Sequence, residues 1–352
     1  MASSSHKEMS VNLDLLRAVA VLSVFFSHLC KALHNDSFIS LGSFGVILFF
    51  VHTSYVLMAS LERLEKTSNS DTSLTLAFWI RRIFRIYPLA ILCVVVMAVF
   101  HIPANPEGTY SWIGLKGLLS NLALIQNLTL SPYIQGPLWS LPLELQMYII
   151  LPFAYFAIRG KRRYRSFALW IFFVLLVPIM VLIMPTNTTI YQRLNVFLYA
   201  PCFTSGIVAF DLIRSKTWTW KLPAWTWPVG VFAAIALFGP HSDAVFPSKL
   251  LRAWVLSLLL GVLYAIVAEA RPNWIHRIFH WIAERSYGIY LSHSVLLWIV
   301  FYQMSQLPLW VRIPSLTAGA IGIPALLFIS IEKPLILAGG HLARRILKSA
   351  AR

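Results

Sequence analysis

Long apolar stretches recur along the chain, and short polar or basic segments separate them. Most stretches run for roughly 18–22 residues, and about 20 residues of α-helix cross a hydrocarbon layer ~30 Å thick. The pattern predicts an all-α integral membrane protein, a bundle of about ten transmembrane helices. The predicted spans are residues 11–30, 42–61, 86–103, 138–158, 167–184, 194–213, 222–238, 251–268, 286–304 and 313–331.

Composition agrees with the membrane class. Of the 352 residues, 58% are hydrophobic and 12% are charged, and the mean hydropathy is +0.72. Soluble domains carry about a quarter charged residues, so this chain lacks the charged surface that a soluble protein needs. No internal repeat or low-complexity tract divides the sequence, and we expect a single membrane domain over residues 1–352.

The net charge of +16 indicates membrane topology and not nucleic-acid binding. If the N-terminus is cytoplasmic, all but seven of the 29 Lys and Arg residues fall in inner segments. This is the positive-inside bias, and inner basic loops also suit the anionic surface of the lipid bilayer. The seven exceptions are Arg17, within the first span, and Lys31, Lys116, Arg193, Lys249, Arg252 and Arg312 on the outer side.

Residues 112–130 are apolar enough to form an additional span, but the charge pattern argues against a crossing. A crossing would place the basic run from Arg159 to Arg165 outside. We therefore expect 112–130 to be a re-entrant or interfacial helix on the outer side, with both termini cytoplasmic. The first apolar run lacks a small-residue cleavage site, so we expect it to be retained as a span.

The three cysteines do not suggest a special site. Cys30, Cys93 and Cys202 lie in or beside apolar spans without CxxC spacing. We therefore expect neither a disulfide framework nor a metal site.

The first span carries ionisable residues on one face. Arg17 and His28 point within about 20° of each other and lie about 16 Å apart along a helix, and Asp14 shares their face. Such groups cost about 2.5–3.5 kcal/mol at mid-membrane and usually mark a functional site. Alternatively, Arg17 reaches the inner headgroups and His28 caps the outer end. That reading fits either residue alone better than the aligned set.

Two later spans carry similar polar stripes. Glu144 and Tyr148 lie one helical turn apart in a span that also contains prolines. Ser286, Tyr290 and His293 share one face of the ninth span. Hydrogen bonds between helices are the structural alternative for both stripes.

The segment RRIFRIYP places Arg81, Arg82 and Arg85 at the inner mouth of the third span. Arg82 and Arg85 are one turn apart, and guanidinium groups bind phosphate through paired hydrogen bonds. Basic flanks are common at inner membrane boundaries, so the pattern alone is weakly specific.

Six segments in order resemble the acyltransferase-3 family of membrane O-acyltransferases, in the stand-alone form without a soluble esterase-like domain. They are LDLLRAVAVLSVFFSHL with Arg17 and His28, FGVILFFVHTSYVLM, RRIFRIYP with Arg82 and Arg85, GPLWSLPLELQMYIILP with Trp139, Ser140 and Glu144, SYGIYLSH, and IEKP with Glu332. The sequence departs from the family pattern at Ile47, His52, Thr53 and Ser54. These departures affect the expected choice of donor or acceptor.

The resemblance implies transfer of an acyl group, commonly acetyl, from cytoplasmic acyl-CoA to a hydroxyl of an exported or lipid-linked carbohydrate. Acetyl-CoA or another acyl-CoA is then a co-substrate, and no metal is required. His28 is the expected general base, with a covalent acyl-histidine as the alternative. Arg17 lies deeper on the donor path, and Glu144 either orients His28 or contacts the acceptor.

The remaining residues complete the implied site. Arg82 and Arg85, with Arg81 as helper, bind the donor phosphates. The expected acceptor or pocket residues are Trp139, Ser140, Tyr148, Ser286, Tyr290 and His293.

A multi-span transporter or flippase for a glycan or anionic substrate remains the alternative function, although the halves show no repeat. A purely structural role fits the aligned ionisable residues least well. In a bacterial cell we expect the inner membrane as the location. The sequence does not identify the acceptor, the acyl chain or the oligomeric state.

Overall fold

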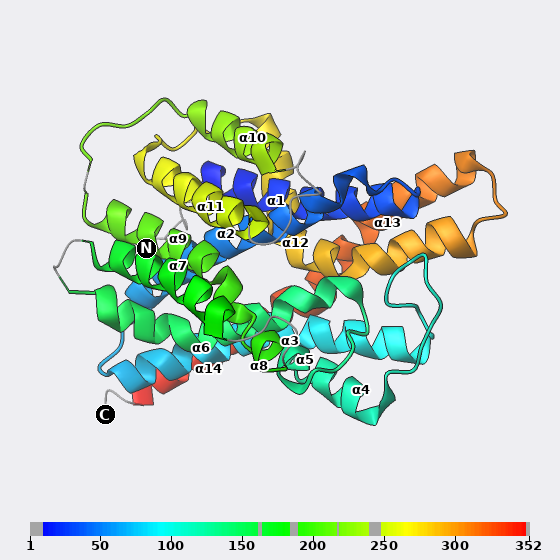
Figure 1. Ribbon diagram of the computed structural model, residues 1–352, viewed down its shortest axis with the longest axis horizontal. Helices are drawn as coiled ribbons and strands as arrows, with labels where there is room; N and C mark the ends of the chain where they lie inside the picture. Colours follow the sequence, from blue (N-terminus) through cyan, green and yellow to red (C-terminus); the bar gives the residue numbers. More distant parts are fainter. Residues whose placement is uncertain (1–9, 161–163, 184–188, 217, 239–247, 350–352) are drawn as a thin grey trace, which may run out of the picture.

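The computed structural model describes residues 10–160, 164–183, 189–216, 218–238 and 248–349. These residues form an elongated helical bundle (Figure 1), with no strand among them beyond one bridge between Leu222 and Val267. The α-helices are α1 (Val11–Ala32), α2 (Ile39–Glu65), α3 (Asp71–Val99), α4 (Gly114–Leu122), α5 (Gln126–Thr129), α6 (Ser140–Ile158), α7 (Arg165–Ile183), α8 (Thr189–Arg193), α9 (Val196–Arg214), α10 (Thr226–Phe238), α11 (Ser248–Ile266), α12 (Trp274–Trp298), α13 (Leu309–Leu327) and α14 (Lys333–Ser349). Short 3-10 turns, η1 (Asp36–Phe38) and η2 (Gly136–Trp139), and π-helical turns, η3 (Ile299–Gln303) and η4 (Phe328–Glu332), complete the order.

The membrane class predicted from the sequence is confirmed. Within the described ranges, eight helical segments are long and apolar enough to cross a membrane. The two other predicted spans correspond to α10, which has only 13 residues, and α12, which has 25 residues and contains several charges. The count of about ten helices therefore holds approximately.

Residues 112–130 do not form a spanning helix, as predicted. The segment contains α4 and α5, and it breaks at Leu124, whose φ is +55°. At nine residues, α4 is about 14 Å long, roughly half the hydrocarbon thickness. Buried amides hold the segment in place, because Gln126 Nε2 donates to Asn121 Oδ1 over 2.9 Å and Ile134 N donates to the same oxygen over 3.0 Å.

Two helices begin earlier than predicted because side chains cap them. Ser70 Oγ accepts a hydrogen bond from Ser73 N over 3.1 Å, and α3 starts at Asp71 and not at residue 86. Asn273 Oδ1 accepts from His276 N over 2.8 Å, and α12 starts at Trp274 and not at residue 286. The segment RRIFRIYP, predicted at the inner mouth of the third span, lies inside the longer helix α3. The sequence analysis also missed α14, which packs along α3.

The helices that carry the predicted site residues lie side by side. Helix α1 packs against both α2 and α12, and α2 packs against α9. Gly206 permits the α2–α9 contact, because a Cβ there would lie 2.1 Å from Ser54 Oγ. The start of α1 and the end of α14 lie at the same end of the bundle, on the left in Figure 1.

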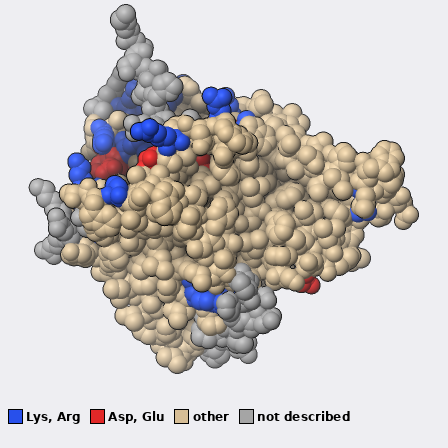
Figure 2. Space-filling model, turned by 90° about the horizontal axis from the view of Figure 1, so that it is seen from above, with Lys and Arg blue, Asp and Glu red and all other residues tan. Residues whose placement is uncertain are grey.

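Charge is distributed unevenly over the bundle. Figure 2 shows most Lys and Arg side chains of that face at the left-hand end, beside a broad uncharged surface. This arrangement matches a bundle with one basic end and an apolar belt. The two chain termini and the basic residues Lys161, Arg162 and Arg163, all predicted on the cytoplasmic side, lie outside the described residues.

Candidate active site

The polar stripe of α1 faces α12. Arg17 Nε donates to Ser286 Oγ over 2.7 Å. Farther along the same two helices, His28 Nδ1 lies 2.9 Å from His293 Nε2, with the two rings stacked at a centroid distance of 4.9 Å. The one-face arrangement predicted for α1 and for α12 is thus present, and the two faces meet.

A small cavity of about 60 Å³, the central pocket, lies between α1, α2, α6 and α12. Phe49, Phe50, Tyr287 and other side chains complete its lining. Five predicted site residues line it, although they come from three separate helices: Arg17, Ser140, Glu144, Ser286 and Tyr290.

Hydrogen bonds fix the polar groups on the α6 side of the central pocket. Tyr148 OH donates to Glu144 Oε1, as their one-turn spacing predicts. Ser140 Oγ and Tyr290 OH lie 2.8 Å apart, and Tyr290 OH also donates to Pro137 O over 2.6 Å. Tyr148 itself is buried and does not line the pocket. Glu144 is bonded to Tyr148 and not to His28.

The hydrogen bonds of His293 determine which nitrogen of His28 can act as a base. His293 Nδ1 lies 2.7 Å from Tyr290 O and 3.2 Å from Ile289 O, both of which are acceptors. Neutral His293 therefore carries its proton on Nδ1, and its Nε2 is an acceptor. His28 Nδ1 must then be the donor, which leaves the lone pair of neutral His28 on Nε2. Among the described residues, the side-chain hydrogen bond of His28 runs through Nδ1, so Nε2 has no side-chain partner there.

The three arginines of α3 have different surroundings. Arg85 Nη1 lies 2.8 Å from Oε2 of Glu332, whose side chain is 0% exposed. Arg82 lies over the Phe78 ring, with Cζ 5.9 Å from the centroid. The buried Nε atoms of Arg81 and Arg82 have no hydrogen-bond partner in the described ranges. Arg85 is therefore already paired, whereas Arg82 has an unused donor.

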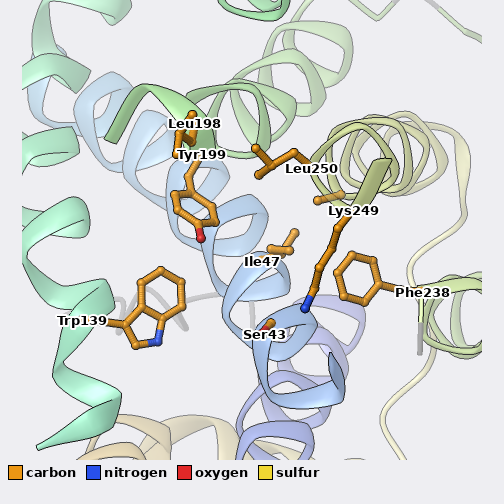
Figure 3. Close-up of a pocket in the computed structure, with 9 residues that line it drawn as sticks. Ser43, Ile47, Trp139, Leu198, Tyr199, Phe238, Lys249 and Leu250 are labelled. Carbon is orange, nitrogen blue, oxygen red and sulfur yellow. The ribbon is translucent and has the colours of Figure 1, made fainter. Parts of the chain in front are cut away.

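A second cavity of about 250 Å³, the aromatic pocket, contains Trp139 (Figure 3). Tyr199, which lines this pocket, packs against both Trp139 and the central-pocket residue Phe50, with ring-centroid distances of 5.4 Å and 5.8 Å. Of the predicted site residues, Trp139 alone lines this second cavity. The other lining residues are Ser43, Ile47, Leu198, Tyr199, Phe238, Lys249, Leu250 and Ala253.

The four departures from the family pattern fall into different surroundings. Ile47 lines the aromatic pocket and Thr53 lines the central pocket. His52 is buried, and Ser54 Oγ donates to Phe50 O over 2.8 Å within α2. Ile47 and Thr53 are therefore the departures placed to influence a bound substrate.

Asp14 lies apart from both cavities. Its Oδ2 is 3.0 Å from His276 Nε2 and 2.8 Å from His280 Nδ1, so the carboxylate joins α1 to the first turns of α12. The ligand-type atoms of these three residues lie within 4.8 Å of one another, a spacing that can hold a metal ion. His276 and His280 are one helical turn apart in the sequence, but no pattern links them to Asp14, which lies 262 residues from His276.

Sequence reasoning also missed Tyr199, Tyr287, Lys249 and Gln135 as residues near the site. Gln135 is fully buried, and its Nε2 donates to Leu291 O over 3.0 Å. One feature of the sequence could have indicated Lys249, because it is among the few basic residues predicted on the outer side.

The described residues thus form a helical membrane bundle with a histidine pair, partly buried arginines and two internal cavities. The acyltransferase domain of the acyltransferase-3 family matches residues 10–331. The chain belongs to this family. Family membership favours an acyltransferase over the transporter alternative.

Two curated relatives illustrate the range of similar proteins. The chain is 25% identical to peptidoglycan O-acetyltransferase OatA of Listeria monocytogenes, over 92% of this chain and 55% of that protein. It is 26% identical to nodulation protein 10 of Rhizobium leguminosarum bv. viciae, over 98% of this chain and 97% of that protein. The chain thus spans about half the length of the first relative and nearly all of the second. No solved structure matches the chain.

Proposed function

We propose that this protein transfers an acyl group, acetyl by resemblance, from acyl-CoA to a hydroxyl of an exported or lipid-linked carbohydrate. It acts as a multi-pass protein of the inner (plasma) membrane, with both termini cytoplasmic. Family membership and the similarity to a peptidoglycan O-acetyltransferase support the reaction class. The observation that carries the proposal is the His28–His293 pair, which presents a lone pair on His28 Nε2.

The donor binds from the basic end of the bundle. Arg82 offers a buried Nε without a partner in the described ranges, and Arg81 lies one residue away. Their guanidinium groups bind the phosphates of CoA by charge-assisted hydrogen bonds. Arg85 either leaves its ion pair with Glu332 and binds a donor phosphate, or it keeps this ion pair and holds Glu332 in place. Arg17, deeper in the central pocket, supports the acyl end of the donor.

The transfer step needs a base because a sugar hydroxyl is a weak nucleophile. His28 Nε2 takes the hydroxyl proton as the acceptor oxygen attacks the thioester carbon. The carbon–sulfur bond then breaks, and the proton passes from His28 to the departing sulfur of CoA. His293 acts as the positioning residue, since its acceptor nitrogen keeps the His28 proton on Nδ1. The same free Nε2 also suits attack on the thioester, which gives the acyl-histidine route.

The test is turnover of acetyl-CoA labelled in the acetyl group by the full protein in nanodiscs, with a crude glycan extract as acceptor. We expect label in the glycan fraction and release of free CoA. If the reaction passes through an acyl-histidine, protein denatured early in the reaction should carry the acetyl label covalently. If correctly folded protein neither binds nor consumes acetyl-CoA with acceptor present, the proposal fails and transport becomes the better reading.

A further inference from the structure

The aromatic pocket has a consistent position in the fold. It is lined by residues from the first half of α2, the end of η2, the first turns of α9 and α11, and the end of α10. In the predicted topology these ends all face outward, where an exported acceptor is found. Trp139 lines this pocket and the next residue, Ser140, lines the central pocket. A ligand here would therefore lie beside the central pocket, which Arg17 and Ser140 line.

Three aromatic rings give the pocket apolar walls. Figure 3 shows the rings of Trp139, Tyr199 and Phe238 around the same space. Trp139 and Tyr199 are tilted by 48° to each other. The C–H faces of a pyranose ring are apolar and its edges are polar, so a sugar suits a cavity with aromatic walls and few polar groups.

Lys249 adds a positive charge to these apolar walls. Figure 3 shows its amino group directed into the pocket, between Ser43 and Phe238. The residue is half-buried, and none of the carboxylates in the described part of the chain forms an ion pair with it. Among the described residues Lys249 is thus a half-buried ammonium group without an acidic partner, and such a group favours an anionic ligand.

We infer that the aromatic pocket binds an acidic saccharide acceptor, with the sugar ring against Trp139 and Tyr199 and the acidic group on Lys249. This inference rests on the proposed function for the identity of the acceptor side. The acidic group is either a ring carboxylate, as in a uronic acid, or a sugar phosphate, as in a lipid-linked sugar. Both present an oxyanion to the ammonium group.

Equilibrium binding to the full protein in nanodiscs tests the inference, using two matched pairs of probes. One pair is digalacturonate and its dimethyl ester, and the other is N-acetylglucosamine 1-phosphate and N-acetylglucosamine. We expect the acidic member of at least one pair to bind about tenfold more tightly than its neutral partner, since hydrogen bonds to charged groups have this strength. The pair that shows the preference identifies the source of the charge.

The variants assign this preference to Lys249. Lys249→Gln should abolish the preference, and Lys249→Arg should restore most of it. Lys116→Gln removes one charge from an exposed position on the same predicted side and should leave the preference intact. Equal binding of acidic and neutral members, binding of no probe, or a preference that survives Lys249→Gln would overturn the inference.

Donor turnover separates this inference from the proposed function. The binding experiment needs no catalysis, so acidic probes can bind through Lys249 even if acetyl-CoA is never consumed. Conversely, acetyl-CoA turnover with no charge preference would leave the proposed function intact and remove the acidic acceptor.

Discussion

His28 and His293 lie on neighbouring helices with Nδ1 of the first 2.9 Å from Nε2 of the second. Two backbone carbonyls of α12 face the other nitrogen of His293. Because carbonyl oxygens only accept hydrogen bonds, His293 carries its proton on Nδ1 and its Nε2 is an acceptor. His28 Nδ1 is then the donor to this Nε2. In the proposed mechanism the pair is an oriented base, because the acceptor nitrogen of His293 favours the His28 tautomer with its proton on Nδ1.

Replacing His293 tests this orientation. His293→Phe removes the acceptor, so His28 loses its preferred tautomer, and we expect kcat to fall about 10²-fold, within the range for general-base effects. His293→Gln can still accept from His28 Nδ1 through its amide oxygen and should retain more activity. The measurement is steady-state transfer together with acetyl-CoA affinity, which should not change. Equal activity of the Phe and Gln variants would contradict the orienting role.

Arg82 should affect donor binding more than the chemical step. Arg82→Gln removes a charge-assisted contact to phosphate, and we expect KM for acetyl-CoA to rise about tenfold. Arg345→Gln is the matched control, because Arg345 is an exposed arginine of α14. Acetyl-CoA titrations of both variants provide the comparison. An unchanged KM for Arg82→Gln, or the same rise in the control, would remove Arg82 from the donor site.

The Arg85–Glu332 pair should contribute to folding. Arg85→Met leaves the carboxylate of Glu332 buried without its ion pair, which typically costs about 3–5 kcal/mol. The double variant Arg85→Met/Glu332→Leu removes both charges and should recover most of the lost stability. Thermal unfolding in one detergent measures both effects. A double variant no more stable than the single variant would show that the pair matters for another reason.

Close packing of α2 on α9 should depend on Gly206. In Gly206→Ala, the new Cβ would lie 2.1 Å from Ser54 Oγ and 2.2 Å from Val51 O, so the helices must separate. Overpacking of this kind typically costs about 1–3 kcal/mol. Gly322→Ala is the control, because no atom lies within 4 Å of its added Cβ. Thermal unfolding should show a lower Tm for the first variant and an unchanged or higher Tm for the second. Equal behaviour would contradict the packing argument.

The sequence predicts most of the helices because each apolar stretch must satisfy its backbone hydrogen bonds internally. It fails where hydropathy carries no signal. The start of α3 depends on Ser70 as a cap, and α14 is amphipathic and lies outside any apolar window. Helix α12 is partly charged, so only its apolar half is visible to a hydropathy reading.

The site is predictable only to the level of helix faces. Helical spacing indicates that Arg17 and His28 share a direction, and the structure places both against α12. Spacing cannot show which helix that face meets, so the His28–His293 contact could not be predicted. Helical spacing also could not show that Arg85 forms an ion pair with Glu332. Such contacts depend on how distant helices pack.

The most direct test compares transfer of labelled acetyl from acetyl-CoA to glycan by wild type and His28→Ala, both folded and inserted in nanodiscs. We expect His28→Ala to bind acetyl-CoA with normal affinity but to lose transfer by about 10²–10⁴-fold, because the general base is missing. Transfer by His28→Ala at the wild-type rate would contradict the assignment of the base.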